Sequence, residues 1–261
     1  MKIYTPAGRA REYSPLALNY YKGCSHNCKY CYVPNMLGRF NSKYVHEDVL
    51  IPTEKGFKEL ELSAKKMQGC NEQILLSFTG DPYCGISSEI TTKVLTILKK
   101  YNHKVAILTK GGDKILNDLE LIKSFGSRIK IGATLTFSEL SDSLEWESEA
   151  ANPKERINVL KTLANKGVKT WASFEPVIIP KQSLSLLLDV VEFIDHVKIG
   201  KINNYKGIDK QIDWSKFIFE SVRILREAKM NDRFYIKKDL LLHNKGVYLS
   251  GNETNEDYLN L

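Results

Sequence analysis

The sequence has no apolar run that approaches the roughly 20 residues needed to span a bilayer. Its first residues, 1–9, lack the apolar segment of a signal peptide. Internal repeats, low-complexity tracts and linkers rich in proline or glycine are also missing. We therefore expect a cytoplasmic protein with no membrane partner, built as a single domain over residues 1–261. Its core should cover about 15–230 and its C-terminal extension 231–261, with residues 1–12 and 250–257 peripheral and mobile.

Cysteine is scarce, and the five cysteines are an odd number. A disulfide framework normally uses an even number and needs an oxidising compartment, whereas thiols stay reduced in the cytosol. The composition therefore favours a metal site that uses some of the cysteines and leaves others as free thiols.

Basic residues are in excess, but they form no block. Lys and Arg number 38 against 31 Asp and Glu, which gives a net charge of +7. A positive chain can attract a polyanion such as nucleic acid, but without a basic cluster a solvated lysine-rich surface explains the charge equally well. The charge therefore permits a nucleic-acid partner and does not identify one.

Three of the cysteines lie within eight residues, with the spacing C-x3-C-x2-C at Cys24, Cys28 and Cys31. Structural metal sites normally close with four protein ligands, so three thiolates leave one coordination position for a cofactor or substrate. A Cys3His zinc site that includes His26 is the alternative, but His26 is only two residues from each flanking cysteine, which would require a very tight loop. The spacing favours an iron–sulfur cluster with an open position.

Short apolar runs alternate with amphipathic segments along the rest of the chain, which is typical of repeated βα units and a parallel sheet. We predict strands near 15–21, 74–78, 105–109, 129–136, 168–174 and 196–200, and helices near 53–68, 87–101, 113–125, 152–166, 183–193 and 213–229. Six such units are too few for the full eight-fold barrel. The expected fold is α/β, a partial (β/α)6 TIM-type barrel with the cysteine loop after the first strand and its chemistry at the carboxyl ends of the strands.

The stretch NYYKGCSHNCKYCYVP at residues 19–34 resembles the cluster loop of the radical S-adenosylmethionine (SAM) superfamily, including the aromatic Tyr30 before the last cysteine. Within that superfamily it is most similar to the branch of spore photoproduct lyase and its relatives, which are termed DNA-repair-photolyase-like. The resemblance implies that Cys24, Cys28 and Cys31 ligate a [4Fe-4S] cluster whose fourth iron binds SAM. It also implies reductive cleavage of SAM to a 5′-deoxyadenosyl radical that abstracts hydrogen from the substrate.

The ends of the second and third predicted strands carry candidate cofactor-binding residues. Thr79, Gly80 and Asp81 occupy the place where the resembling enzymes bind the methionyl amino group, and a carboxylate beside a glycine can grip an ammonium. Thr-Gly-Asp-Pro is also a common turn sequence. By the same similarity Lys110 is a candidate for the carboxylate of SAM, and a solvated lysine in a capping loop is the alternative.

Later strands supply three further candidates. Thr134 and Thr136 alternate along one strand and should point to the same face, where they can reach the ribose or simply satisfy each other inside the barrel. Glu175 follows the fifth predicted strand and is a candidate contact for substrate or adenosyl groups. We expect Glu147 and Arg156 to form an ordinary surface ion pair.

Cys84 is the candidate catalytic residue, because a substrate radical must be quenched by a hydrogen atom that a thiol at the barrel mouth can supply. In spore photoproduct lyases the donor cysteine aligns with Phe78, so this chain departs from that pattern. Cys70 precedes the second strand and should be inert, since free cysteines are commonly small buried hydrophobic residues.

The resemblance implies an external one-electron donor of the flavodoxin or ferredoxin type. For the substrate, a nucleic acid or nucleotide in a lyase-like reaction is the first hypothesis. A peptide, a small molecule or a partner protein is the second, and it fits the missing cysteine at Phe78. A non-catalytic zinc-binding module remains the alternative from another class.

Overall fold

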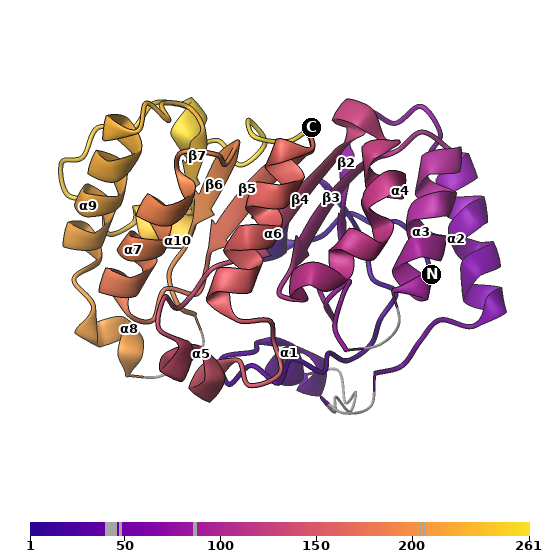
Figure 1. Cartoon of the computed structure of the whole chain (residues 1–261), viewed down its shortest axis with the longest axis horizontal. Helices are drawn as coiled ribbons and strands as arrows, with labels where there is room; N and C mark the ends of the chain where they lie inside the picture. Colours follow the sequence, from indigo (N-terminus) through magenta and orange to yellow (C-terminus); the bar gives the residue numbers. More distant parts are fainter. Residues whose placement is uncertain (40–45, 47–48, 86–87, 204, 206) are drawn as a thin grey trace.

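The computed structural model describes residues 1–39, 46, 49–85, 88–203, 205 and 207–261. A seven-stranded parallel sheet runs in sequence order from β1 to β7 and curls into a half-barrel (Figure 1). Its strands are β1 (Leu16–Leu18), β2 (Gln73–Leu76), β3 (Lys104–Thr109), β4 (Ile129–Thr134), β5 (Lys169–Phe174), β6 (His196–Ile199) and β7 (Phe234–Ile236). The predicted class, an α/β partial TIM-type barrel, is confirmed.

The longer helices cover the outer face of the sheet, and shorter ones lie at its end (Figure 1). They are α1 (Val33–Gly38), α2 (Glu54–Lys66), α3 (Glu89–Lys100), α4 (Leu119–Lys123), α5 (Leu140–Trp146), α6 (Pro153–Asn165), α7 (Pro180–Val190), α8 (Ile208–Gln211), α9 (Trp214–Glu227) and α10 (Lys238–Leu241). Short 3₁₀ helices are η1 (Gly8–Glu12), η2 (Gly112–Asp118), η3 (Gly126–Arg128) and η4 (Asn252–Thr254). In the described part of the chain, no helix is long and apolar enough to cross a membrane.

Capping signals in the sequence explain where two of these helices begin. The side chain of Asn152 accepts a hydrogen bond from the amide of Glu155, and Pro153 fills the first position of α6. Asp213 caps α9 in the same way, through the amide of Lys216. The predicted helix at 113–125 forms as η2 followed by α4. The start that we predicted for α3, at residue 87, lies outside the described residues.

Beyond the six predicted strands, the sequence at 233–239 fits a final strand, a lid or a dimer contact, and the structure makes it a strand. β7 pairs with β6, and the amide of Lys237 continues the pairing by donating to the carbonyl of Ile199 at 2.9 Å. Three residues give too little periodicity to decide between these alternatives from the sequence. The half-barrel therefore extends into the segment 231–261 that we treated as an extension.

Alternation along the strands separates an apolar outer face from a mixed inner face. On β2, Ile74 and Leu76 pack outward against the helices, whereas Leu75 belongs to a small inner cluster with Ala106 and Trp171. The inner face also carries buried polar residues, including Lys130 on β4 and Lys198 on β6. Buried charges need partners, so something must close the barrel over these lysines.

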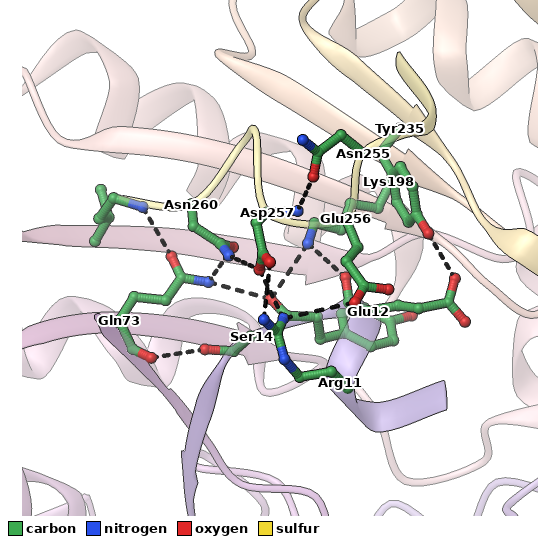
Figure 2. Close-up of polar contacts among 12 residues, drawn as sticks. Arg11, Glu12, Ser14, Gln73, Lys198, Tyr235, Asn255, Glu256, Asp257 and Asn260 are labelled. Atoms are coloured by element: carbon green, nitrogen blue, oxygen red, sulfur yellow. Dashed lines mark hydrogen bonds and ion pairs between the residues drawn. The ribbon is translucent and has the colours of Figure 1, made fainter. Parts of the chain in front are cut away.

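The C-terminal tail and the N-terminal segment together provide that closure (Figure 2). Lys130 Nζ donates to the carbonyl of Leu259 at 2.7 Å, and Lys198 Nζ donates to the carbonyl of Glu12 at 2.7 Å. Asp257 binds Arg11 through both carboxylate oxygens, at 2.6 and 2.8 Å. Residues 1–12 and 250–257 are therefore not peripheral as we expected, because the N-terminal segment and the tail supply acceptors and ion-pair partners to side chains of the barrel and to each other.

Candidate active site

A cavity of about 330 Å³ opens where the carboxyl ends of the strands meet. Its walls come from segments that follow different strands and from the N-terminal segment, so residues distant in sequence lie together. The predicted site residues that line it are Cys24, Cys28, Tyr30, Cys31, Gly80, Asp81, Lys110, Thr134 and Glu175. Chemistry was expected at this end of the sheet, and most of the predicted residues converge there.

The cysteine loop leaves β1 through two residues with positive φ, Gly23 at 106° and Asn27 at 50°. The amide of Cys31 donates to the carbonyl of Cys28 at 3.0 Å, which closes a turn around the last two cysteines. Cys28 is buried, while Cys24 and Cys31 are partly exposed. All three thiols face one cavity from a single compact loop.

The loop is not arranged around a single ion. No three His, Cys, Asp or Glu side chains in the described part of the chain are grouped closely enough to hold one metal ion. His26 is buried beside Asp81, with Nδ1 3.5 Å from Oδ2, and burial lowers the pKa of His26 to about 4. The geometry therefore does not favour the Cys3His zinc alternative, whereas three spaced thiols on a cavity wall fit a larger iron–sulfur core.

Burial raises the pKa of the Cys28 thiol to about 11, although the nearby Lys110 opposes the effect. The pKa of Cys24 is also raised, first by a hydrogen bond with Cys84 and then by burial. Thiols must lose their protons to bind iron. Loading the site therefore releases protons.

Asp81 is the organising residue at the end of β2. Its Oδ1 accepts from the hydroxyl of Thr109 at 2.6 Å and from the amide of Tyr83 at 2.8 Å, and its Oδ2 accepts from the amide of Lys110 at 2.8 Å. Thr79 differs from our expectation: its hydroxyl donates to the carbonyl of Tyr21 at 2.9 Å, and it is not among the described lining residues. Asp81 is thus held rigidly on the cavity wall, while Thr79 anchors the loop.

Lys110 and Tyr30 form the wall next to the cysteines. The ammonium of Lys110 lies 5.3 Å from the centre of the Tyr30 ring. Burial would lower the pKa of Lys110, but the charges of Cys28 and Glu147 outweigh it and the pKa is raised. Lys110 therefore carries a positive charge on the cavity wall.

The two threonines separate. Thr134 lines the cavity, whereas Thr136 lies beyond the end of β4 and is fully buried, with its hydroxyl 3.4 Å from that of Tyr30 and 3.3 Å from Glu147. Strand alternation stops at Thr134, so the two side chains no longer share a face.

Glu147 and Arg156 do pair, but our expectation of a surface ion pair is wrong. Arg156 Nη2 lies 2.6 Å from Glu147 Oε2, and both side chains are almost completely buried beneath the cysteine loop. Burial would raise the pKa of Glu147, but Arg156 and Lys110 lower it below its ordinary value. The residues after α5 fold back under the loop, a contact that local sequence does not encode.

The cavity wall opposite the cysteines joins the predicted Glu175 to Tyr13, Asn203 and Lys237, which were not among the predicted site residues. Glu175 accepts a hydrogen bond from the hydroxyl of Tyr13 at 2.5 Å and forms an ion pair with Lys237. The amide of Asn203 lies 3.4 Å from Glu175 Oε1. A Cβ on Gly200 would lie 2.8 Å from Glu175 and 2.9 Å from Lys237, so only glycine leaves room for both. Lys237 directly follows β7, and a basic pair after a possible final strand is the sequence signal that points to it.

Cys84 is not where a hydrogen-atom donor was expected. It is fully buried, it is absent from the lining among the described residues, and its thiol contacts Cys24. Phe78 lines the cavity instead. This placement does not favour a donor role for Cys84, since a donor must face the substrate. Cys70 packs at the edge of the core, away from the cavity.

Sequence comparison decides the family. The radical SAM superfamily profile matches residues 18–194. The chain belongs to the radical SAM superfamily. Radical SAM enzymes use a [4Fe-4S] cluster and SAM, and they need an external electron donor. The match includes the cysteine loop, Asp81, Lys110 and Glu175, but ends before Asn203 and Lys237.

Curated relatives include an uncharacterized protein of Methanocaldococcus jannaschii, 32% identical over 165 residues. The match covers 62% of this chain and 60% of that relative. An uncharacterized protein of Acidianus two-tailed virus is 24% identical over 225 residues, which cover 81% of this chain and 74% of the viral protein.

Solved structures with the same fold include two radical SAM enzymes. Streptococcus suis SuiB bound to SAM matches with a TM-score of 0.64 and 15% identity, over 90% of this chain and 53% of SuiB. Spore photoproduct lyase with dinucleoside spore photoproduct matches with a TM-score of 0.66 and 12% identity, over 89% of this chain and 78% of the lyase. At these identities the likeness shows the fold alone.

Proposed function

We propose that this radical SAM protein cleaves SAM reductively and uses the product radical to abstract hydrogen from a nucleotide or nucleic-acid substrate in a lyase-like reaction. The observation that carries the proposal is the convergence of Cys24, Cys28 and Cys31 on one cavity with Asp81 and Lys110. When bound, the cluster supplies the electron that splits SAM into methionine and a 5′-deoxyadenosyl radical.

The chain's own residues bind and orient the cofactors. Cys24, Cys28 and Cys31 would ligate the cluster and leave one of its coordination positions for SAM. The negative Asp81 and the positive Lys110 stand on the same cavity wall, and their charges match the ammonium and carboxylate of methionine. Tyr30, Thr134 and Glu175 contact the adenosyl group. Gly80, which has no side chain, lets SAM approach the backbone closely. Within the described structure, Thr79 and Thr136 do not line the cavity but stabilise its wall through their hydrogen bonds.

The wall opposite the cysteines supports an anionic substrate. Arg9, Lys201 and Lys237 line this half of the cavity, against the single carboxylate of Glu175. Their other acidic partners, Asp239 for Arg9 and Asp209 for Lys201, are not among the described lining residues. Each of these cations therefore has a carboxylate partner, so this wall offers guanidinium and ammonium donors to a phosphate without a net positive charge. The likeness to spore photoproduct lyase, which was solved with a dinucleoside, points to the same substrate class.

One observation favours a second candidate, a peptide, small-molecule or protein substrate. Phe78 lines the cavity and Cys84 does not, so in the described lining the cluster cysteines supply all the thiols. A reaction that needs a protein thiol to quench a nucleotide radical is therefore less favoured. SuiB, a neighbour in fold, was solved bound to its precursor peptide.

Anaerobic purification tests the enzyme class. The protein should be brown and hold about four irons per chain, and dithionite with SAM should release 5′-deoxyadenosine. Cys28→Ala should lose both colour and product, whereas Cys70→Ala, a matched change away from the cavity, should keep them. A colourless protein with one zinc, or a Cys28→Ala protein that keeps iron and turnover, contradicts the proposal.

Two further assays address the partners. Binding of single-stranded DNA that weakens steeply with salt supports a nucleic-acid substrate, whereas 5′-deoxyadenosine release stimulated only by peptide or small-molecule fractions of a cell extract supports the second candidate. The electron donor that we propose is a flavodoxin or ferredoxin of the cytoplasm, because an oxygen-sensitive cluster requires a reducing compartment. Replacement of dithionite by either protein tests that assignment.

A further inference from the structure

The segment at 147–151, which follows α5, connects the cysteine loop to the strands. On one side, the amide of Glu149 donates to the carbonyl of His26 in the cysteine loop at 3.3 Å. On the other side, the amide of Ala151 donates to the carbonyl of Lys110, also at 2.9 Å. In Figure 1, α5 and α1 accordingly lie together at one end of the sheet. The segment is therefore a backbone bridge between the two cofactor-binding loops.

Glu147 places a carboxylate at the centre of this bridge. Its side chain accepts the hydroxyl of Tyr30, lies 3.3 Å from the hydroxyl of Thr136 and pairs with Arg156 at 2.6 Å. Arg156 is itself fixed, because its Nη1 donates to the carbonyl of Thr134 at 3.0 Å. The Tyr30 side chain is thus held at its hydroxyl end from outside the cavity, while its ring lines the cavity.

The buried ion pair of Glu147 and Arg156 needs an explanation other than stability. Well-packed apolar residues stabilise a core as well as a buried ion pair does, because the pair loses its hydration. A carboxylate, however, holds a phenol in one direction, which apolar packing does not. The hydrogen bond from the Tyr30 hydroxyl to Glu147 therefore fixes the orientation of the Tyr30 ring.

We propose that Glu147 is a positioning residue that sets the Tyr30 ring and the cysteine loop before any ligand binds. The proposal rests on the proposed function, in which Tyr30 contacts the adenosyl group of SAM. Glu147 does not line the cavity among the described residues, so it acts only through Tyr30 and the loop.

Three variants test the proposal. Glu147→Gln removes the charge, Tyr30→Phe removes only the hydroxyl and leaves the buried ion pair intact, and Glu149→Gln makes the same chemical change on an exposed side chain two residues away. Hydrogen–deuterium exchange of residues 24–31 is measured in the metal-free protein. Glu147→Gln and Tyr30→Phe should each raise the exchange rate at least threefold, and Glu149→Gln should not.

The loaded enzyme gives a second readout. Glu147→Gln and Tyr30→Phe should each raise the KM for SAM about tenfold and change kcat for 5′-deoxyadenosine release by less than threefold. The double variant should be no worse than either single variant, because residues that act as one unit give non-additive effects. A purely structural role would not produce this coupling.

Contrary results are equally clear. If Tyr30→Phe matches the wild type in exchange and KM, or if the two effects multiply in the double variant, the proposal is overturned. Should Glu147→Gln fail to fold, Tyr30→Phe decides alone. If the wild-type protein does not cleave SAM, the proposed function fails, while exchange in the metal-free protein still tests the coupling of Glu147 to Tyr30.

Discussion

Gly80→Ala should push the segment after β2, which carries Asp81, away from the cysteine loop. A Cβ at Gly80 would lie 2.7 Å from the carbonyl oxygen of Gly23 and 2.9 Å from Cβ of Tyr21. Ordinary contacts between carbon atoms are about 3.5–4.0 Å, so the neighbours must move by most of an ångström. They cannot move freely, because Tyr21 is tied to Thr79 and Gly23 directly precedes Cys24. Gly80 does not have positive φ, so the cost comes from crowding alone.

Crowding of this kind costs about 1–3 kcal/mol in a packed core, and each kcal/mol should lower the Tm by roughly 2–4 °C in a chain of this size. Thermal unfolding of the metal-free protein measures the stability, and iron content after reconstitution measures the displacement of Cys24. Gly80→Ala should lose stability and bind less iron than the wild type.

Gly251→Ala is the matched control for this prediction. No atom lies within 4 Å of a Cβ built at Gly251, and its φ of −58° suits any residue. The control should therefore keep its Tm and its iron. If Gly80→Ala is indistinguishable from Gly251→Ala in both measurements, the close approach of the two loops is not a constraint on the site, and the reasoning is refuted.

Further predictions concern the barrel beneath the cavity. Burial and the nearby charge of Lys237 lower the pKa of Lys198 to about 7. Above pH 7 the unfolded chain therefore binds a proton that the folded chain does not. Between pH 7 and 9 the free energy of unfolding of the wild type should rise by roughly 2 kcal/mol relative to that of Lys198→Met. If the unfolding free energies of the wild type and Lys198→Met change with pH in the same way, Lys198 is not the cause of the pH dependence. Glu253→Gln removes the charge of a buried carboxylate that pairs with the partly exposed Arg226 and should cost about 1.5–3 kcal/mol. An unchanged Tm would show that the tail is not anchored there. Gly132→Ala would bring a methyl group within 2.4 Å of Trp171 and should destabilise by about 1–3 kcal/mol, with a shift in tryptophan fluorescence that a harmless substitution would not produce.

Local sequence predicted the features that depend on neighbouring residues. The spacing of Cys24, Cys28 and Cys31 places three thiols on one loop whatever the rest of the chain does. The alternation of apolar runs and amphipathic helices predicted a parallel sheet, and the positions after its strands predicted Asp81, Lys110 and Glu175 as cavity residues. These inferences need only strand direction and side-chain periodicity, which are properties of short segments.

Contacts between distant segments required the tertiary structure. Glu147 and Arg156 looked like surface residues because each lies in a polar segment, yet the fold buries both under the cysteine loop. Cys84 follows the right strand, but the following turn directs its thiol into the core rather than the cavity.

By itself, therefore, the sequence determined the cofactor chemistry and the direction of the sheet, because a few residues at fixed spacing encode each of them. The wall opposite the cysteines, where Tyr13 meets Glu175 and Lys237, joins residues up to 224 positions apart. Contacts of Lys130 with the tail and of Lys198 with the N-terminal segment likewise join residues that are distant in sequence. Only the closing of the sheet brings such residues together, since the burial that makes each contact favourable exists only once the strands have paired.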